Sequence, residues 1–456
     1  MVSTPADPVR PRRAIAALVA SLLTIELLAG VQTYVTQTVL PLLAADLGGA
    51  HLYGPLDAAA QAPTFLMLPA GAWLLARFRT DRLLLWFTAL AVVGSATCAL
   101  APSAGVLLAG TAVRAVAGGA LATVSMGAIV RGLPARHRQL VLAGLSGTWV
   151  VSSLLGPLYA VAVSQHLGWR WALVLHLPLL VAARAVAARC VPSEPAAGAG
   201  ERVPWGWAVV LAAGSLTLAL PVGPWSALAV AVGAALMLRA AAALLPAGAL
   251  RARRGRPAAL SALLAVASAY FGATAVLSVV GHDALGLAPH AYGLVVAVPG
   301  LAWAVCGLWT GAHPALDDAR FRRRGARAAW GLVAGAAVVA VTGALADRPA
   351  LVLAGLLVGA ALLGGGMGSL YPDLLGRCLA RPDPDDGLSD ARAATAVVLA
   401  EAVGLALATT AAFTWLGSGL GLVHEPRTRV VVLYAALVAV ALVAARRLAA
   451  AARSGP

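Results

Sequence analysis

The sequence contains no lysine: each of its 33 basic residues is an arginine. Charged residues of either sign make up only 11% of the 456 residues, whereas 61% are hydrophobic. Soluble globular chains carry about 25% charged residues, so this chain has too little polar surface to coat a soluble fold. With a mean hydropathy of +0.87, the composition indicates an integral membrane protein.

Cysteine is also scarce, with four residues that lie in or beside apolar runs without any paired spacing. We therefore expect no disulfide, no metal site and no bound cofactor. The net charge of +15 would suggest a nucleic-acid partner in a soluble chain. Here the arginines stand between apolar runs, which is a topological signal rather than a nucleic-acid-binding one. Residues 1–13 are short, polar and basic, and they predict a cytoplasmic tail rather than a cleaved leader.

Long apolar runs dominate the chain, and a membrane span needs about 20 such residues. We count fourteen candidate spans. They cover residues 15–43, 56–76, 83–101, 105–130, 139–164, 169–188, 205–223, 226–247, 258–280, 290–311, 328–346, 350–375, 393–416 and 429–447.

Arginine is distributed unequally between the two sides that these spans define. If the N-terminus is cytoplasmic, 28 arginines lie in cytoplasmic loops and tails, four lie outside and Arg114 lies in the membrane. By the positive-inside rule, this split predicts that both termini are cytoplasmic and that the number of spans is even. We expect a multi-pass protein of the inner (plasma) membrane.

A short repeat divides the chain into halves. Ala76-Arg-Phe-Arg79 after the second run recurs as Ala319-Arg-Phe-Arg322 after the tenth, 243 positions later. This placement fits two parallel six-helix halves. We therefore predict a six-helix bundle at 1–190, a linker with two additional spans at 191–257 and a second six-helix bundle at 258–456.

The first run carries an ionisable residue. Glu26, Gly30, Thr33 and Gln37 recur at helical spacing, so they share one face of an otherwise apolar helix. A carboxylate in the bilayer centre costs about 2.5–3.5 kcal/mol on insertion scales, which favours a site on a substrate or proton path. The alternative is a protonated glutamate that bonds a neighbouring helix.

Two further charged residues lie well inside predicted spans and are candidates for the site. Arg114 shares a face with Thr111, and we predict that it pairs with Glu26 across a cavity wall, either as part of proton coupling or as a static ion pair. Glu401 is a candidate proton site or contact for a cationic substrate, and a neutral buried glutamate that bonds a facing helix is an equal alternative.

Aromatic and acidic residues complete the candidate set. The rings of Trp149, Tyr270 and Trp303 can stack on a flat or cationic ligand, although packing aromatics are commoner. Asp57 is expected at the extracellular mouth, with a solvated residue at a helix start as the alternative. Asp373 is a candidate gate residue or an interfacial acid.

Several segments resemble the major facilitator superfamily, and specifically its fourteen-span branch of drug:proton antiporters. They are Thr38-Val-Leu-Pro41, Gly156-Pro157, Leu167-Gly-Trp-Arg-Trp171 and Gly366-Met-Gly-Ser-Leu-Tyr-Pro372. The resemblance implies an all-α membrane protein of two six-helix bundles plus two inserted helices. It also implies close helix approach at Gly156 and Pro157, and a gate at Asp317, Asp318 and Arg320.

We therefore expect a secondary transporter that uses the proton gradient to export small lipophilic or cationic compounds by alternating access. A dedicated exporter of a metabolite, natural product or lipid is the alternative. No catalytic triad, phosphate loop or His/Cys ligand set suggests an enzyme. The expected partners are a small-molecule substrate and the lipid bilayer, without nucleic acid, and the protein is expected to be a monomer.

Overall fold

The computed structural model describes residues 12–132, 135–191, 205–220, 223–251, 255–379 and 390–452. Every regular element in these ranges is helical. Parts of the linker predicted at 191–257, namely residues 192–204, 221–222 and 252–254, lie outside the described residues. The all-α membrane class that the family resemblance implies is confirmed within these ranges.

The first group of helices ends before residue 191. Its members are α1 (Arg12–Leu47), α2 (Tyr53–Arg77), α3 (Thr80–Ala99), α4 (Ala104–Gly132), α5 (Ala135–His166), α6 (Trp169–Ala172) and α7 (Leu177–Cys190). Two more helices follow, α8 (Trp205–Leu218) and α9 (Ser226–Leu244). The run predicted at 169–188 is broken into α6 and α7.

The remaining helices begin at residue 256. They are α10 (Arg256–Thr274), α11 (Leu277–Val279), α12 (Pro289–Ala312), α13 (Asp318–Leu345), α14 (Pro349–Cys378), α15 (Asp390–Ser418) and α16 (Pro426–Ala451). A single π-helical segment, η3 (Val280–Ala284), follows α11. Each of the fourteen predicted runs therefore corresponds to helix in the described residues.

Twelve of the described helical stretches are long and apolar enough to cross a membrane. Of the fourteen predicted runs, the two whose helices are not among these twelve correspond to α2 and α8. With 14 residues, α8 extends only about 21 Å at 1.5 Å per residue, less than the roughly 30 Å of a bilayer core. The protein is thus a multi-pass membrane protein with about twelve spans.

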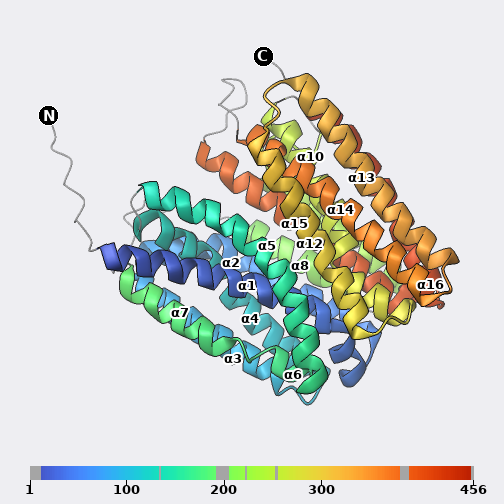
Figure 1. Ribbon diagram of the computed structural model, residues 1–456, viewed down its shortest axis with the longest axis horizontal. Coiled ribbons are helices and arrows are strands. Elements are labelled where there is room, and N and C mark those ends of the chain that lie inside the picture. Colours follow the sequence, from blue (N-terminus) through green and yellow to red (C-terminus); the bar gives the residue numbers. More distant parts are fainter. Residues whose placement is uncertain are drawn as a thin grey trace.

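The helices form two groups that diverge from one another, as Figure 1 shows. Helices α1–α7 make the first half and α10–α16 the second, and the beginning of α1 and the end of α16 lie on the side where the halves diverge. We call that side the arginine-rich end, because Arg77 and Arg79 lie there, and the opposite side the closed end. Helix α1 runs from the arginine-rich end to the closed end, and α2 returns.

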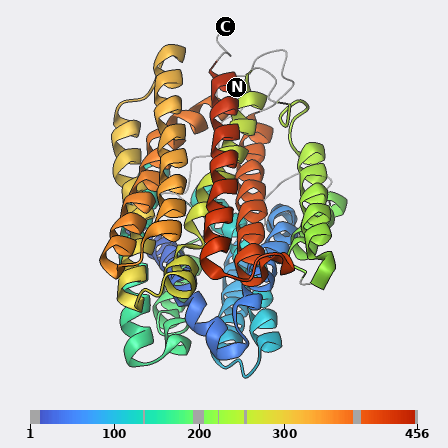
Figure 2. The ribbon, with the colours of Figure 1, turned by 90° about the vertical axis from the view of Figure 1, so that its right-hand side faces the viewer.

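The helix pair α8–α9 lies at one edge of the molecule (Figure 2). Helix α8 packs against α2 of the first half, and both α8 and α9 contact α15 of the second half. The pair therefore touches both halves rather than extending one of them.

Glycine allows the closest helix packing in each half. A Cβ atom on Gly156 of α5 would lie 2.5 Å from the Cβ of Tyr34 in α1. In the second half, Gly364 and Gly368 of α14 bring that helix against the backbone of α12 at Pro299 and Trp303. Small residues allow such backbone approach between membrane helices, where no hydrophobic driving force acts.

Candidate functional site

Hydrogen bonds join the two halves at the closed end. The Tyr53 hydroxyl donates to Asp283 Oδ2 at 2.5 Å, and Asp283 Oδ1 lies 2.7 Å from His282 Nδ1. Ser278 Oγ donates to the Gln37 carbonyl at 2.6 Å. These contacts place the beginning of α2 and the outer part of α1 against the segment that follows α10.

Asp57 joins α2 to α15 in the same region. Its Oδ2 atom accepts hydrogen bonds from Thr409 Oγ1 at 2.9 Å and Thr410 Oγ1 at 2.7 Å. Both threonines are buried. The residue expected at the extracellular mouth thus lies in a contact between the halves.

A third contact brings the backbone of α12 against α1 and α5. A Cβ atom on Gly300 would collide with the side chains of Ser153 and Tyr34. One turn beyond this contact, toward the arginine-rich end, lie Trp149 on α5 and Trp303 on α12. We call these three contacts between the halves the closure. The two tryptophans therefore lie on facing helices of opposite halves, next to the closure on the side of the arginine-rich end.

Glu26 belongs to a group of polar residues within the first half. Trp149 Nε1 donates a hydrogen bond to Glu26 Oε1 at 2.9 Å, and the indole is 42% exposed. Arg184 of α7 is buried and within electrostatic range of Glu26. Its Nη1 atom donates to Ser125 Oγ at 3.3 Å.

The structure does not form the predicted pair between Glu26 and Arg114. Among the described residues, no ion pair joins them, and the α1 contact of Arg114 is Thr36 Oγ1 at 3.5 Å. Thr36 lies ten residues beyond Glu26 on α1, which is about 15 Å along the helix axis. The arginine close to Glu26 is Arg184 of α7.

The second half contains a carboxylate at the end of a row of aromatic rings. The Tyr371 hydroxyl donates to Glu401 Oε2 at 3.0 Å. The Tyr371 ring lies 5.3 Å from that of Trp303, which lies 5.1 Å from that of Tyr270. Four helices, α15, α14, α12 and α10, thus contribute one side chain each to a continuous group, which we call the Glu401 row.

The two carboxylates lie at similar depths in their halves. Glu26 is eight residues from Tyr34 on α1, and Glu401 is eight residues from Thr409 on α15. Both Tyr34 and Thr409 belong to the closure. Each carboxylate therefore lies about 12 Å beneath the closure, at 1.5 Å per residue.

Two other predicted cavity residues pack against neighbouring helices. Gly30 packs against Ser152 of α5, and Thr111 is buried, with its hydroxyl bonded to the Leu107 carbonyl at 2.8 Å. Gly30 and Thr111 therefore serve helix packing rather than a cavity wall. Thr33 is exposed and bonds the Ala29 carbonyl at 3.1 Å.

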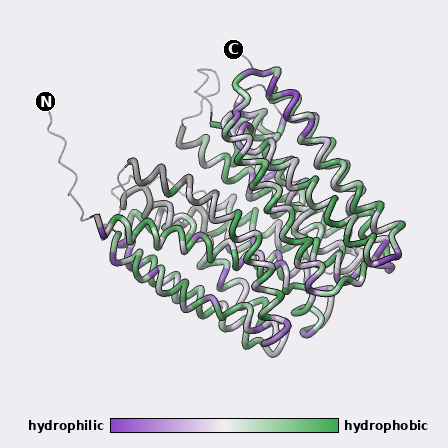
Figure 3. Tube along the Cα trace, viewed as in Figure 1, coloured by the Kyte–Doolittle hydropathy of each residue, from purple (hydrophilic) through white to green (hydrophobic). Residues whose placement is uncertain are grey.

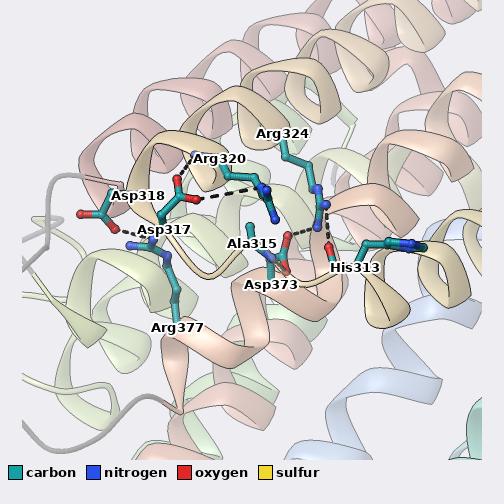
Figure 4. A network of polar contacts seen from close by, with 8 residues as sticks. All are labelled: His313, Ala315, Asp317, Asp318, Arg320, Arg324, Asp373 and Arg377. Carbon is teal, nitrogen blue, oxygen red and sulfur yellow. Dashed lines mark hydrogen bonds and ion pairs between the residues drawn. The ribbon is translucent and has the colours of Figure 1, made fainter.

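The predicted gate residues at the arginine-rich end form a network shown in Figure 4. Asp373 accepts from Arg324 Nη1 at 2.5 Å and from the Ala315 amide at 2.9 Å. Asp318 pairs with Arg377 at 2.5 Å. Asp317 caps α13 by accepting from the Arg320 amide at 2.6 Å.

This network differs from the expected gate in one respect. Among the described residues, every partner of Asp317, Asp318 and Asp373 belongs to the second half. The network therefore braces the loop between α12 and α13 against α14, and does not join the halves. Arg320 donates its backbone amide to Asp317, and its exposed side chain forms an ion pair in which Nε lies 4.0 Å from Asp317 Oδ2.

Two functional candidates escaped the sequence analysis. Tyr371 entered only as part of a family-like segment, because its hydroxyl lies about six helix turns along α14 and the sequence does not show its partner. Arg184 is one of the 28 arginines assigned to the cytoplasmic side, although it stands four residues before the end of the predicted run at 169–188. Within the described residues, no group of three or more metal-ligating side chains occurs.

A two-half helical membrane protein that is closed at one end, with ionisable groups between the halves, has the architecture of a secondary transporter. The family model of the Major Facilitator Superfamily matches residues 22–382. The chain belongs to this superfamily, as its motifs suggested.

Curated relatives match over parts of their length. The multidrug export protein EmrB of Haemophilus influenzae is 25% identical over 32% of this chain and 29% of its own. The MFS-type efflux pump LUC4 of a Fusarium species is 28% identical over 49% and 42%, respectively. The MFS-type transporter pydD of an Acremonium species is 31% identical over 36% and 28%. The chain thus matches less than half the length of each.

Solved structures share the fold over nearly the whole chain. An auto-inhibited peptide transporter of the POT family superposes with a TM-score of 0.65 at 15% identity, covering 95% of this chain and 96% of the other. A POT family transporter in complex with 5-aminolevulinic acid gives 0.66 at 11% identity, covering 93% and 94%. These likenesses establish the fold.

Proposed function

We propose that the protein exports small lipophilic cations in exchange for protons, by alternating access between the two halves. The observation that carries this proposal is the Glu401 row, a partly exposed carboxylate followed by three aromatic rings beneath the closure. Aromatic faces attract desolvated cations by about 2 kcal/mol or more. A negatively charged carboxylate also attracts the cation, and protonation of the carboxylate removes this attraction.

The two carboxylates have different roles in this proposal. Glu26 has Arg184 within electrostatic range, so its negative charge is partly offset. Among the described residues, Glu401 has only the Tyr371 hydroxyl as a partner. Glu401 is therefore the carboxylate that binds either a proton or the substrate cation, while Glu26 and Trp149 form the opposite wall.

The cycle follows from this competition. A proton that reaches Glu401 from outside neutralises the carboxylate and releases the cation, and loss of the proton to the cytoplasm restores the site. The proton gradient then supplies the energy, without any cofactor. The structure described above is the state that is open toward the arginine-rich end.

The topology proposed with this function has fourteen spans, with α2 and α8 crossing the membrane beside the twelve. The arginine-rich end and both termini face the cytoplasm of a cell with this protein in its inner (plasma) membrane, and the protein acts as a monomer. The bundles comprise residues 1–190 and 258–456. A reporter fused after Gly223, between α8 and α9, should report the outer side. A cytoplasmic signal at that position would show that the α8–α9 pair does not cross the membrane as proposed.

Transport in proteoliposomes tests the function. With an imposed pH gradient, the wild type should move an aromatic cation such as ethidium, and Glu401→Gln should abolish the gradient-driven part because the amide cannot be protonated. Asp347→Asn is the matched control, since that carboxylate is 86% exposed at the surface. Unchanged gradient-driven transport by Glu401→Gln would contradict the proposal.

A competition panel separates broad export from the dedicated export of one metabolite, natural product or lipid. If unrelated lipophilic cations all inhibit ethidium transport, the site recognises charge and apolar area. If only one chemical class inhibits, the dedicated exporter is the better description. Tyr371→Phe should weaken cation binding while keeping proton coupling, because it removes only the hydroxyl bonded to Glu401.

A further inference from the structure

A groove separates α13 from α16 near the arginine-rich end, far from the Glu401 row. It has a volume of about 120 Å³ and is lined by Arg322, Gly325, Ala326, Ala329, Trp330, Val333, Leu442, Ala445, Leu448 and Ala449. Figure 1 places both helices along the outer edge of the second half. Every lining residue except Arg322 is apolar or carries an apolar ring.

The groove has the length of one bilayer leaflet. From Arg322 to Val333, α13 advances eleven residues, which is about 16 Å at 1.5 Å per residue. That is about half of the roughly 30 Å hydrocarbon core. Trp330, which is 64% exposed, lines the groove between Arg322 and Val333. The acyl chain of a lipid whose headgroup lies at Arg322 could thus follow the groove across one leaflet.

Arg322 is the charged residue at the mouth of the groove, and it has no ion pair among the described residues. The three acids nearest in the network are already engaged, Asp317 with Arg320, Asp318 with Arg377 and Asp373 with Arg324. Figure 3 shows the hydrophilic stretch with which α13 begins. Arg322, Arg323 and Arg327 are all exposed there.

We propose that this groove binds one anionic phospholipid, with an acyl chain between α13 and α16 and the phosphate held by Arg322. Charge complementarity decides the class of lipid, because the exposed guanidinium of Arg322, which has no ion pair in the part of the chain that the structure describes, favours an anionic headgroup over a zwitterionic one. Basic pockets between membrane helices bind such headgroups. The site lies outside the transport path and is independent of the proposed substrate.

Native mass spectrometry of the purified full-length protein tests the proposal, with added phosphatidylglycerol or phosphatidylcholine. The wild type should retain one phosphatidylglycerol in preference to phosphatidylcholine. Arg322→Gln should weaken that binding about fivefold, the effect of one arginine at an anionic membrane surface. Arg323→Gln is the matched control, because it removes the same charge from the adjacent position outside the groove.

The acyl chain is tested separately by filling the groove. Ala326→Phe on one wall and Ala449→Phe on the other should each prevent retention, and both alanines are exposed, so the core is not disturbed. Ala334→Phe, on the same helix but outside the lining, should retain the lipid. Equal binding of both lipids, equal loss with Arg322→Gln and Arg323→Gln, or full retention by both groove-filling variants would each overturn the proposal.

Discussion

A leucine in place of Gly300 is expected to abolish transport while leaving both halves folded. Gly300 is the position where α12 lies against α1 and α5, and a Cβ there would collide with Ser153 and Tyr34. Leucine adds three more carbons. The collision lies between the halves, so the protein can relieve it by keeping them apart at the closed end.

This separation removes one of the two states that alternating access requires. Substrate could still bind, but the closed end would not re-form, and the carrier could not return with its site open to the arginine-rich end. The initial rate of transport in proteoliposomes should fall to the level of empty vesicles. A spin label at His51 and another at Leu422, both exposed at the closed end, should report a longer distance.

Gly311→Leu is the matched control, because no atom lies within 4 Å of a Cβ at that position on the same helix. It should transport normally and keep the short distance between the labels. Normal transport by Gly300→Leu would mean that the closure is not part of the cycle. A large fall in the unfolding temperature would show instead that the contact stabilises the fold.

The sequence predicts the helices and the family well, because both depend on local information. Apolar runs identify the segments that must be helical in lipid, where every backbone group needs an internal partner. The stripe from Glu26 to Gln37 likewise predicts a non-lipid face. Helical periodicity identifies such a face but not the helix that packs against it.

That limit explains the errors in the candidate site. Glu26 and Arg114 were expected to pair because both are charged and both lie in spans, yet Arg114 contacts α1 about 15 Å away from Glu26. The packing of α7 against α1 instead brings Arg184 close to Glu26. Gly30 and Thr111 fall on polar stripes, but these two residues face neighbouring helices of the same half.

The contacts of the closed end are long-range, and no local pattern announces them. Asp57 and Thr410 are 353 positions apart, and Tyr53 and Asp283 are 230 apart. Tyr270, Trp303 and Glu401 were each predicted as cavity residues, but separately. Only the packing of four helices shows that Tyr371 links the carboxylate to the rings.

Asp373→Ala is expected to destabilise the second half by about 3–5 kcal/mol, the usual cost of leaving one member of a buried ion pair without its partner. The side chain of Asp373 is 4% exposed and that of Arg324 is 12% exposed. The substitution also removes the acceptor for the Ala315 amide. Unfolding in detergent, followed by circular dichroism, should show a lower midpoint than that of the wild type.

Two comparisons distinguish this charge effect from simple loss of packing. Asp347→Ala breaks an ion pair of 2.7 Å with Arg427 whose carboxylate is 86% exposed, and it should cost no more than about 1 kcal/mol because water replaces the partner. Arg324→Leu combined with Asp373→Ala should recover part of the lost stability, because no unpaired charge then remains buried. A double variant less stable than Asp373→Ala alone would show that Arg324 stabilises the loop mainly through its bond to the His313 carbonyl and its contact with the Trp309 ring. The brace would then depend on the guanidinium itself, and its carboxylate partner would be secondary.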